Sequence, residues 1–575
     1  MDFLPYPLSY ARRKTRVVRV GNVCLGGKNP IRVQSMLTSA TADIDDCMKQ
    51  ICALYKAGSE LIRLAVTSGR DLEAVGEIRR RMQEEGISAP LVADVHFSPR
   101  LAIDACELFE KVRINPGNYT DVSKNTNKKH SPGFEEGRER LKEAIAPLVG
   151  SLRKFGRALR IGVNHGSLST RMIERYGNSP RGMVESALEM EKLLEEQEFD
   201  QFVISLKSSN PIIAQKAYRL LAARQPDSGA TPFHLGVTEA GNGVMGRMNG
   251  LVGIGTLLRD GLGDTIRVSL AEDSVNEILY AHKLLQSLET LRESRHHDSS
   301  VWSRKLDHQR VRNESLLGDN IEIGNASPLK IGTAQKSECF GTAAQLEPDF
   351  PFETDGDSIR SDRLAKPLFL SSNIANVNRA DMSRHSAILL DTDSLLFDLR
   401  RHYKRQEQSN TASPPVGILL RLESDTDGIL PVEMELAAVL GEGLADFLLV
   451  PESITAAQTE KLICLLQATR SRTLLPDYIV CPSCGRTLFD LQRTTKKIKA
   501  ATQHLKGIKI GIMGCIVNGP GEMADADFGF VGSGAGKIDL YVGQKRVQRG
   551  IEESKAVGAL IRLIKKHNRW IEPNS

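Results

Sequence analysis

A regular alternation of short apolar strands with helical stretches runs through the first half of the chain and restricts its fold more than any other feature. Eight strand candidates fall at 31–36, 61–66, 91–97, 111–115, 159–164, 202–209, 234–240 and 265–270, and helical patterns such as 45–57 and 183–196 lie between several of them. This alternation is typical of parallel sheets, and eight strands are the number that closes into a (β/α)8 TIM barrel. An open doubly wound sheet is the competing arrangement. Residues 16–23 are expected to form a hairpin at the barrel bottom.

Polar residues recur at every second position of these strands. Side chains alternate between the two faces of a strand, and the outer face must pack on helices, so the polar set is expected to point inward. Five of its members are cations: Arg63, Arg113, Arg160, Lys207 and Arg267. Any one of them can be an ordinary paired interior residue. Two like charges about 4 Å apart repel by roughly 4 kcal/mol at an effective dielectric near 20, so five together favour a ligand with several phosphate charges. Asp94 and Glu239 offset part of this charge and are candidate acid–base groups.

Composition limits the function classes. A net charge of +5 over 575 residues is too small to imply nucleic acid by itself. No apolar stretch approaches the roughly 20 residues of a membrane span, and residues 1–10 do not resemble a signal peptide. Nine cysteines, odd in number and mostly in apolar segments, indicate a reducing compartment rather than a disulfide framework. We therefore expect a soluble, cytoplasmic protein.

A second group of chemically active residues lies near the C-terminus. Cys481 and Cys484 form a C-x-x-C pair, and Cys515 follows later, just before an Asn-Gly-Pro-Gly run and Glu522. Thiolates bind zinc or iron–sulfur clusters, and three cysteines leave one place for a weaker ligand, for which Glu522 is the nearest candidate. The Asn-Gly-Pro-Gly run is expected to exclude a helix and to form a tight loop.

The pattern of elements divides the chain into four parts. We expect a TIM-barrel substrate-binding domain over 1–290, a linker or loosely ordered segment over 291–365, a small α/β insertion domain over 366–472 and an α+β cluster domain over 473–575. The insertion carries strand patterns at 368–371, 385–390, 416–422 and 446–450 and a helical pattern at 433–440, and has no motif of its own.

Several strings of the chain resemble the 4-hydroxy-3-methylbut-2-enyl diphosphate synthase family, which are iron–sulfur enzymes of the methylerythritol phosphate route to isoprenoids. The strings are VQSM (33–36), VADVHF (92–97), VRINPGN (112–118), RIGVN (160–164), SLKSSN (205–210), LGVTEAG (235–241), GDTIRVS (263–269) and the two cysteine segments. The long middle segment resembles the large form of the family, found in plants and in some bacteria.

The resemblance implies an oxidoreductase that opens and dehydrates 2-C-methyl-D-erythritol 2,4-cyclodiphosphate by a two-electron reduction, with ferredoxin or flavodoxin as the electron donor. It implies one 4Fe–4S cluster per chain, held by Cys481, Cys484 and Cys515 with Glu522 as a labile ligand of the fourth iron. By similarity, the diphosphate is bound by Arg63, His96, Arg113, Arg160, Asn164, Lys207, Ser269 and Asn518. Glu239 is the expected acid–base group, and His96 and Glu522 are also expected to be catalytic.

The sequence leaves some alternatives open. A zinc-structured protein whose barrel binds a nucleotide or RNA without redox chemistry is the rival function. An active site closed within one chain and one closed between two chains of a homodimer are both compatible with the sequence. Neither the choice of electron donor nor the role of the insertion can be read from it.

Overall fold

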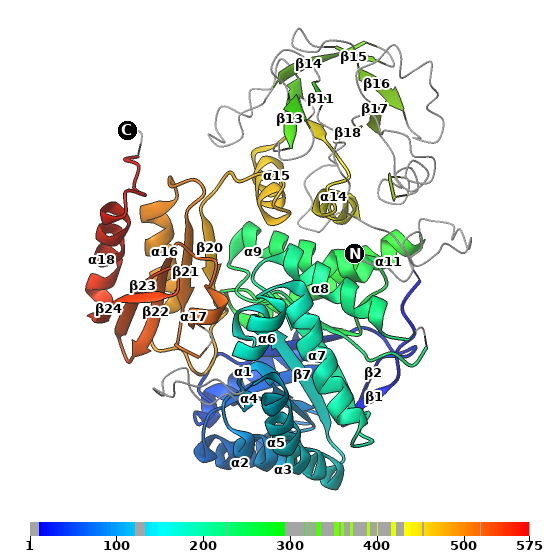
Figure 1. Ribbon diagram of the computed structural model, residues 1–575, viewed down its shortest axis with the longest axis vertical. Coiled ribbons are helices and arrows are strands. Elements are labelled where there is room, and N and C mark those ends of the chain that lie inside the picture. Colours follow the sequence, from blue (N-terminus) through cyan, green and yellow to red (C-terminus); the bar gives the residue numbers. More distant parts are fainter. Residues whose placement is uncertain are drawn as a thin grey trace. The chain divides into compact units, whose positions relative to one another are not determined.

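The computed structural model describes residues 11–120, 133–226, 228–293, 454–517 and 519–573, together with short stretches between 315 and 450. The chain forms two compact units, of which the first comprises residues 1–11, 259–261 and 286–474 and the second comprises 12–258, 262–285 and 475–575. The barrel and the cysteine-bearing domain therefore belong to one unit (Figure 1).

Eight parallel strands form the barrel of the second unit, as the alternation predicts. In sheet order they are β8 (Phe202–Lys207), β7 (Ala158–Asn164), β6 (Lys111–Ile114), β5 (Leu91–Val95), β4 (Leu61–Val66), β3 (Arg32–Met36), β10 (Thr265–Ile266) and β9 (His234–Leu235). A parallel bridge between Ile204 of β8 and Phe233, just before β9, joins the two ends of this sheet. The prediction of a (β/α)8 barrel is confirmed, and the open sheet is wrong.

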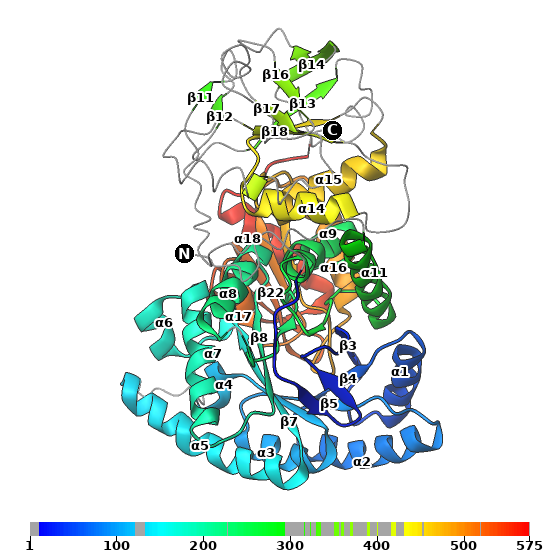
Figure 2. The same ribbon diagram turned by 90° about the vertical axis from the view of Figure 1, so that its right-hand side faces the viewer.

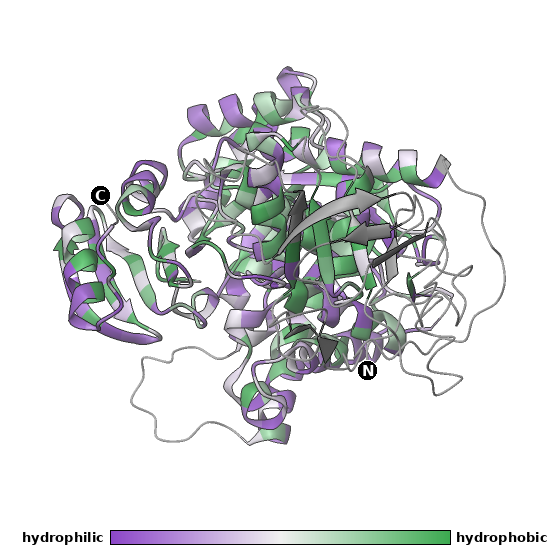
Figure 3. Cartoon of the chain, turned by 90° about the horizontal axis from the view of Figure 1, so that it is seen from above, coloured by the Kyte–Doolittle hydropathy of each residue, from purple (hydrophilic) through white to green (hydrophobic). Residues whose placement is uncertain are grey.

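Helices surround the strands, and the sequence marks where they begin. The helices α1 (Ile44–Lys56), α2 (Gly69–Glu84), α3 (Pro99–Leu108), α5 (Phe134–Phe155), α7 (Pro180–Glu195), α8 (Pro211–Arg224) and α11 (Ser274–Glu293) are the longer ones (Figure 2). Three of them start at a proline preceded by a capping side chain: Ser98 before α3, Ser179 before α7 and Asn210 before α8. Proline fits the first helical turn, and a Ser or Asn oxygen accepts one of its free N–H groups. Along these helices hydrophilic and hydrophobic residues alternate, so that one side packs on the strands (Figure 3).

The predicted hairpin closes one end of the barrel. Strands β1 (Val18–Val20) and β2 (Val23–Leu25) pair antiparallel. Val18, Val20 and Leu25 are buried in one apolar cluster with Leu61, Val92, Ala158 and Val203, which lie at or near the first residues of β4, β5, β7 and β8. The hairpin thus fills the N-terminal end of the barrel, and the polar residues described below occupy the opposite end.

The cysteine-bearing domain is a five-stranded mixed sheet with helices packed on it. Its strands are β20 (Asp477–Val480), β21 (Lys509–Met513), β22 (Phe528–Gly534), β23 (Lys537–Val542) and β24 (Lys545–Glu552), in that order. The first three are parallel and the last two pair antiparallel. Helices α16 (Leu491–Thr502) and α18 (Glu553–Lys566) contribute apolar residues to a common core with the strands (Figure 1). This is the expected α+β domain.

The first unit contains a smaller closed barrel. Its strands, in order, are β13 (Lys330–Ala334), β14 (Phe350–Asp355), β15 (Ser358–Arg360), β16 (Leu368–Ser371), β17 (Ile388–Leu390), β18 (Val416–Leu419) and β19 (Phe447–Val450). Helices α14 (Pro431–Gly441) and α15 (Ala456–Ala468) belong to the same unit. β13, β14 and β15 fall inside the range 291–365, so part of the segment expected to be a linker is a folded part of this sheet. β14 and β15 lie in acidic, Pro- and Gly-containing sequence, and β13 is a short strand just before it, so no regular alternation indicated them.

Candidate active site

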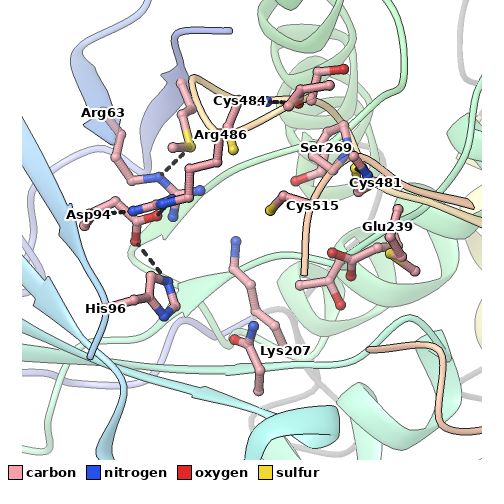
Figure 4. A pocket seen from close by; sticks show the side chains of 18 of the residues that line it. Arg63, Asp94, His96, Lys207, Glu239, Ser269, Cys481, Cys484, Arg486 and Cys515 are labelled. Carbon is pink, nitrogen blue, oxygen red and sulfur yellow. Dashed lines mark hydrogen bonds and ion pairs between the residues drawn. The ribbon is translucent and has the colours of Figure 1, made fainter. Parts of the chain in front are cut away.

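The inward-pointing polar residues of the barrel line one pocket together with the cysteines. This pocket spans about 730 Å³, including the part that is open to solvent. On the barrel side it is bounded by Arg63, Asp94, His96, Arg113, Arg160, Asn164, Lys207, Thr238, Glu239, Arg267 and Ser269. On the other side it is bounded by Cys481, Cys484, Arg486 and Cys515. Figure 4 shows the side chains of Lys207 and Cys515 pointing into the space between the two halves. Every predicted site residue of the barrel reaches this pocket.

The five predicted cations differ in how far their charge is compensated. Arg113 Nη1 lies 3.1 Å from Asp94 Oδ1, and Arg267 Nε lies 3.3 Å from Glu277 Oε2. Arg63 Nε donates to Met36 Sδ at 3.0 Å. Arg160 is only 1% exposed, and its Nε and Nη1 have no hydrogen-bond partner within the described residues. A buried guanidinium with unpaired donors is costly, which favours an anionic ligand in the pocket.

Burial shifts the protonation of these groups toward their neutral forms. The pKa values of Arg160 and Lys207 are lowered well below their usual range by burial and by the neighbouring arginines, and that of Arg63 is lowered to about 9. An anion bound among them reverses these shifts, since opposite charge stabilises the cationic forms. The site is therefore electrostatically prepared for a polyanion.

His96 is held in place by two side chains from the neighbouring strand and its following helix. Its Nδ1 is 3.0 Å from Asn118 Nδ2, and its Nε2 contacts the Arg113 guanidinium and lies 3.7 Å from Asp94 Oδ1. Burial and the Arg113 charge lower the pKa of His96 to about 4. The imidazole is therefore neutral near pH 7 when the pocket holds no anion.

The three cysteines come to one edge of the C-terminal sheet because they follow neighbouring parallel strands. Cys481 comes directly after β20, and Cys515 comes two residues after β21. We call residues 481–487 and 514–522 the cysteine loops. Gly514 donates its backbone N–H to Cys481 Sγ at 3.1 Å, and Ser483, between the paired cysteines, has a positive φ of 63°. This backbone geometry holds the loop in a tight turn around the thiols.

The chemistry of the donor set fits an iron–sulfur cluster. Cys481, Cys484 and Cys515 all line the pocket. Cysteine thiolates are the usual ligands of such clusters, and each thiolate binds a separate iron.

Glu522 faces the barrel. Its Oε1 accepts from Asn164 Nδ2 at 2.7 Å, and its Oε2 accepts from Thr238 Oγ1 at 3.0 Å. No helix carries both Cys515 and Glu522, as expected, but the end of the Asn-Gly-Pro-Gly run forms the one-turn helix α17 (Gly519–Glu522) with Glu522 as its last residue. The proline lies in the first turn, where it costs no backbone hydrogen bond.

Glu239 and Cys481 lie beside each other because the residues next to them in the sequence form a β-bridge. Ala240 forms a parallel bridge with Val480, which joins the segment that follows β9 to the last residue of β20 in the C-terminal sheet. Glu239 has a positive φ of 51°, a conformation that is strained for a non-glycine residue and is often found at functional sites. Burial and the nearby Glu522 charge raise the pKa of Glu239 well above its usual range, and its Oε2 has no hydrogen-bond partner among the described residues.

Sequence reasoning missed four residues of this network. Arg486, Thr238 and Met36 line the pocket, and Glu277 pairs with Arg267 and also accepts from Ser35 Oγ at 2.8 Å. Arg486 had a signal, since it stands two residues after Cys484, which the resemblance gives as a cluster ligand. Glu277 had none, because an acidic residue in the first turn of a helix is common. The prediction for Asn518 lies outside the described residues.

Fold and site together define a TIM-barrel protein whose cationic pocket is also lined by the cysteines of an α+β domain. Two family models match the chain: the GcpE TIM-barrel domain over residues 15–282 and the GcpE protein C-terminal domain over residues 477–566. The chain belongs to this family, and the resemblance drawn from its strings is confirmed.

Relatives match along the whole chain. A protein of Akkermansia muciniphila named 4-hydroxy-3-methylbut-2-en-1-yl diphosphate synthase (flavodoxin) is 38% identical, covering 100% of this chain and 99% of the relative. A protein of Porphyromonas gingivalis with the same name is 39% identical, covering 98% and 99%. One of Oryza sativa subsp. japonica, named 4-hydroxy-3-methylbut-2-en-1-yl diphosphate synthase (ferredoxin), chloroplastic, is 36% identical, covering 98% and 88%. The family is one of oxidoreductases, so the rival reading as a zinc-structured binding protein is not favoured.

In the part of the chain that the structure describes, no helix combines the length and the apolarity that crossing a membrane requires. The cytoplasmic location expected from the sequence stays a prediction.

Proposed function

We propose that this chain is a 4-hydroxy-3-methylbut-2-enyl diphosphate synthase that reduces 2-C-methyl-D-erythritol 2,4-cyclodiphosphate. One substrate molecule, two electrons and two protons give one product molecule and one water. The observation that carries the proposal is the meeting of a polycationic barrel mouth and three thiols in one pocket. The names of relatives that match over the full length support the same reaction.

The barrel residues are proposed to bind and orient the diphosphate. Arg63, Arg113, Arg160 and Lys207 supply the charge, and the two unpaired donors of Arg160 suit phosphate oxygens. His96, Asn164 and Ser269 add hydrogen bonds at the same mouth, and Asn518 is proposed to join them from the cysteine loop. Binding through the diphosphate leaves the carbon skeleton of the ring directed at the cysteine loops.

Cys481, Cys484 and Cys515 are proposed to hold a 4Fe–4S cluster, with Glu522 as an exchangeable ligand of the fourth iron. When bound, such a cluster supplies electrons one at a time and a Lewis-acidic iron. The hydrogen bonds from Asn164 and Thr238 give the Glu522 carboxylate a place on the barrel when it is not a ligand. Glu239 lines the pocket beside Cys481 with one oxygen unpaired among the described residues, and we propose that it transfers the proton to the leaving oxygen.

The experiment is anaerobic purification followed by iron and sulfide analysis and by turnover of the cyclodiphosphate with reduced flavodoxin or ferredoxin. We expect a brown protein with broad absorption at roughly 400 nm and formation of the linear diphosphate. Glu522→Ala should keep that absorption and lose most turnover, whereas Cys515→Ser should lose the absorption. Zinc in place of iron, or full turnover by Glu522→Ala, contradicts the proposal.

We also infer that one copy of the chain is sufficient for activity. Both halves of the pocket come from the same compact unit of one chain. Complementation decides the point: Lys207→Ala mixed with Cys515→Ser should remain inactive. Recovered activity in the mixture, with a dimer in analytical ultracentrifugation, indicates closure between chains.

A further inference from the structure

Arg486 connects a cysteine loop directly to a barrel strand. Its side chain is only 9% exposed, although it belongs to a loop. Nη1 donates to Asp94 Oδ2 at 3.0 Å, and Nη2 donates to the backbone oxygen of Asp94 at 2.7 Å (Figure 4). A guanidinium bonded through two nitrogens has a fixed orientation, so this contact sets where the loop carrying Cys484 lies relative to β5.

Asp94 divides its carboxylate between two arginines with different tasks. Oδ2 accepts from Arg486, and Oδ1 lies 3.1 Å from Arg113 Nη1. Asp94 itself is 4% exposed. A single buried carboxylate therefore links an arginine proposed to bind the diphosphate to the loop proposed to hold the cluster, and a change at one arginine is felt at the other.

The two halves approach each other at backbone distance around this ion pair. A Cβ added to Gly166 of the barrel would lie 2.1 Å from the carbonyl oxygen of Gly521, and one added to Gly485 would lie 2.5 Å from that of Ser39. Only glycine permits such contacts. Because Gly485 adjoins Arg486, the close backbone approach to Ser39 and the contact of the guanidinium with Asp94 are made by the same turn of the loop.

Seating the loop brings a sixth cation to a mouth that already holds five. Like charges about 4 Å apart repel by roughly 4 kcal/mol at an effective dielectric near 20, and Asp94 compensates Arg113 and Arg486 together. A bound diphosphate adds several negative charges and removes this repulsion. A ligand that stabilises the seated position of the loop also binds more tightly when the loop is seated, since coupling between two equilibria is reciprocal.

We propose that Arg486 is a positioning residue that seats the cysteine loop on the barrel and, through the carboxylate it shares with Arg113, couples seating to diphosphate binding. The identity of the anion rests on the function proposed above, whereas the coupling itself needs only a polyanion. Arg486 acts through Asp94 and the loop.

The test uses the full-length, cluster-loaded protein and inorganic pyrophosphate as the probe. Hydrogen–deuterium exchange of peptides covering 481–490 and 91–97 reports seating, and calorimetry reports the dissociation constant of pyrophosphate. We compare the wild type with Arg486→Gln, with Arg486→Lys, and with Gly166→Ala as a steric variant that keeps all charges. Absorption at roughly 400 nm verifies that each variant retains its cluster.

In the wild type, pyrophosphate should slow exchange in both peptides. In Arg486→Gln this protection should be lost and pyrophosphate should bind about 5- to 100-fold more weakly, the usual range of coupling between sites. Arg486→Lys should restore part of both effects, because it restores the charge but not the two-nitrogen geometry. Gly166→Ala should lose the protection for steric reasons, which calibrates the exchange readout.

If Arg486→Gln shows the same protection from hydrogen–deuterium exchange and the same affinity for pyrophosphate as the wild type, the proposal is overturned. Equal loss of protection in Arg486→Gln and Arg486→Lys without any change in pyrophosphate affinity also overturns it, because that result indicates a structural role alone. Turnover of the cyclodiphosphate is not part of this readout, so a failure of the proposed reaction is recognised separately. Where turnover is present, Arg486→Gln should lower kcat as well as raise KM.

Discussion

Replacing Arg160 with methionine should stabilise the fold and abolish ligand binding at the same time. Arg160 is 1% exposed, and two of its donor nitrogens have no partner among the described residues. Replacing a buried charge by a hydrophobic side chain of similar size is often stabilising by about 1–4 kcal/mol. Each kcal/mol shifts the melting temperature by about 2–4 °C in a domain of 150–250 residues, so we expect a rise of about 2–16 °C.

The same two nitrogens set the loss of affinity. Hydrogen bonds to charged groups contribute about 1.5–3 kcal/mol each, so two bonds to phosphate oxygens amount to about 3–6 kcal/mol. With about 1.4 kcal/mol per factor of ten, pyrophosphate should bind about a hundred- to ten-thousand-fold more weakly. Scanning calorimetry with and without pyrophosphate measures both effects on one protein.

Arg171 provides the matched control. It is equally a buried arginine, but it pairs with Glu189, with Nη1 2.8 Å from Oε1, and it lies outside the pocket lining. Arg171→Met should cost about 3–5 kcal/mol, because it leaves a buried carboxylate unpaired, and should leave pyrophosphate affinity unchanged. If Arg160→Met destabilises the protein as much as Arg171→Met does, the idea that the empty pocket contains an uncompensated charge is refuted.

Three further predictions follow from the same network. Burial lowers the folded-state pKa of His96 to about 4, below its unfolded value. Its contribution of about 3 kcal/mol to the free energy of unfolding is therefore present above roughly pH 6.5 and is lost as the pH falls through 4. His96→Asn should flatten the pH dependence of the free energy of unfolding over this window. Glu277→Gln should misplace Arg267 and weaken pyrophosphate binding about tenfold or more, and an unchanged dissociation constant in calorimetry would contradict this. Gly521→Ala, whose Cβ would lie 2.0 Å from the Gly166 carbonyl oxygen, should leave the cysteine loops unseated, and unaltered hydrogen exchange in the loop peptides would show that the contact is dispensable.

Much of the site could be predicted because alternate residues of a barrel strand point to opposite faces, one toward the interior and one toward the helices. Arg113 and Arg160 face inward since they alternate with Val112, Leu159 and Ile161, which are fully buried against the helices. Strands β9 and β10 are shorter than their apolar patterns, and Glu239, four residues after the end of β9, has a positive φ. No local sequence pattern predicts a positive φ that tertiary contacts impose on a non-glycine residue.

The contacts between the two halves could not be predicted in the same way. Arg486 and Asp94 are 392 positions apart, and an arginine after a C-x-x-C pair gives no periodic signal of its partner. Gly166 and Gly521 have no side chains whose pattern could reveal their contact. Glu522 was predicted as a metal ligand, but its hydrogen bonds to Asn164 and Thr238 depend on how the loop sits on the barrel. Such pairings are set by the tertiary structure alone.

The hairpin at the N-terminal end of the barrel has a consequence for how a ligand reaches the pocket. Val18, Val20 and Leu25 pack there in an apolar cluster with the starts of the strands, so among the described residues the barrel axis is blocked at that end. If the proposed reaction takes place in the pocket, substrate and product must pass on the side of the cysteine loops. Movement of these loops would then limit turnover whenever it is slower than the chemical step.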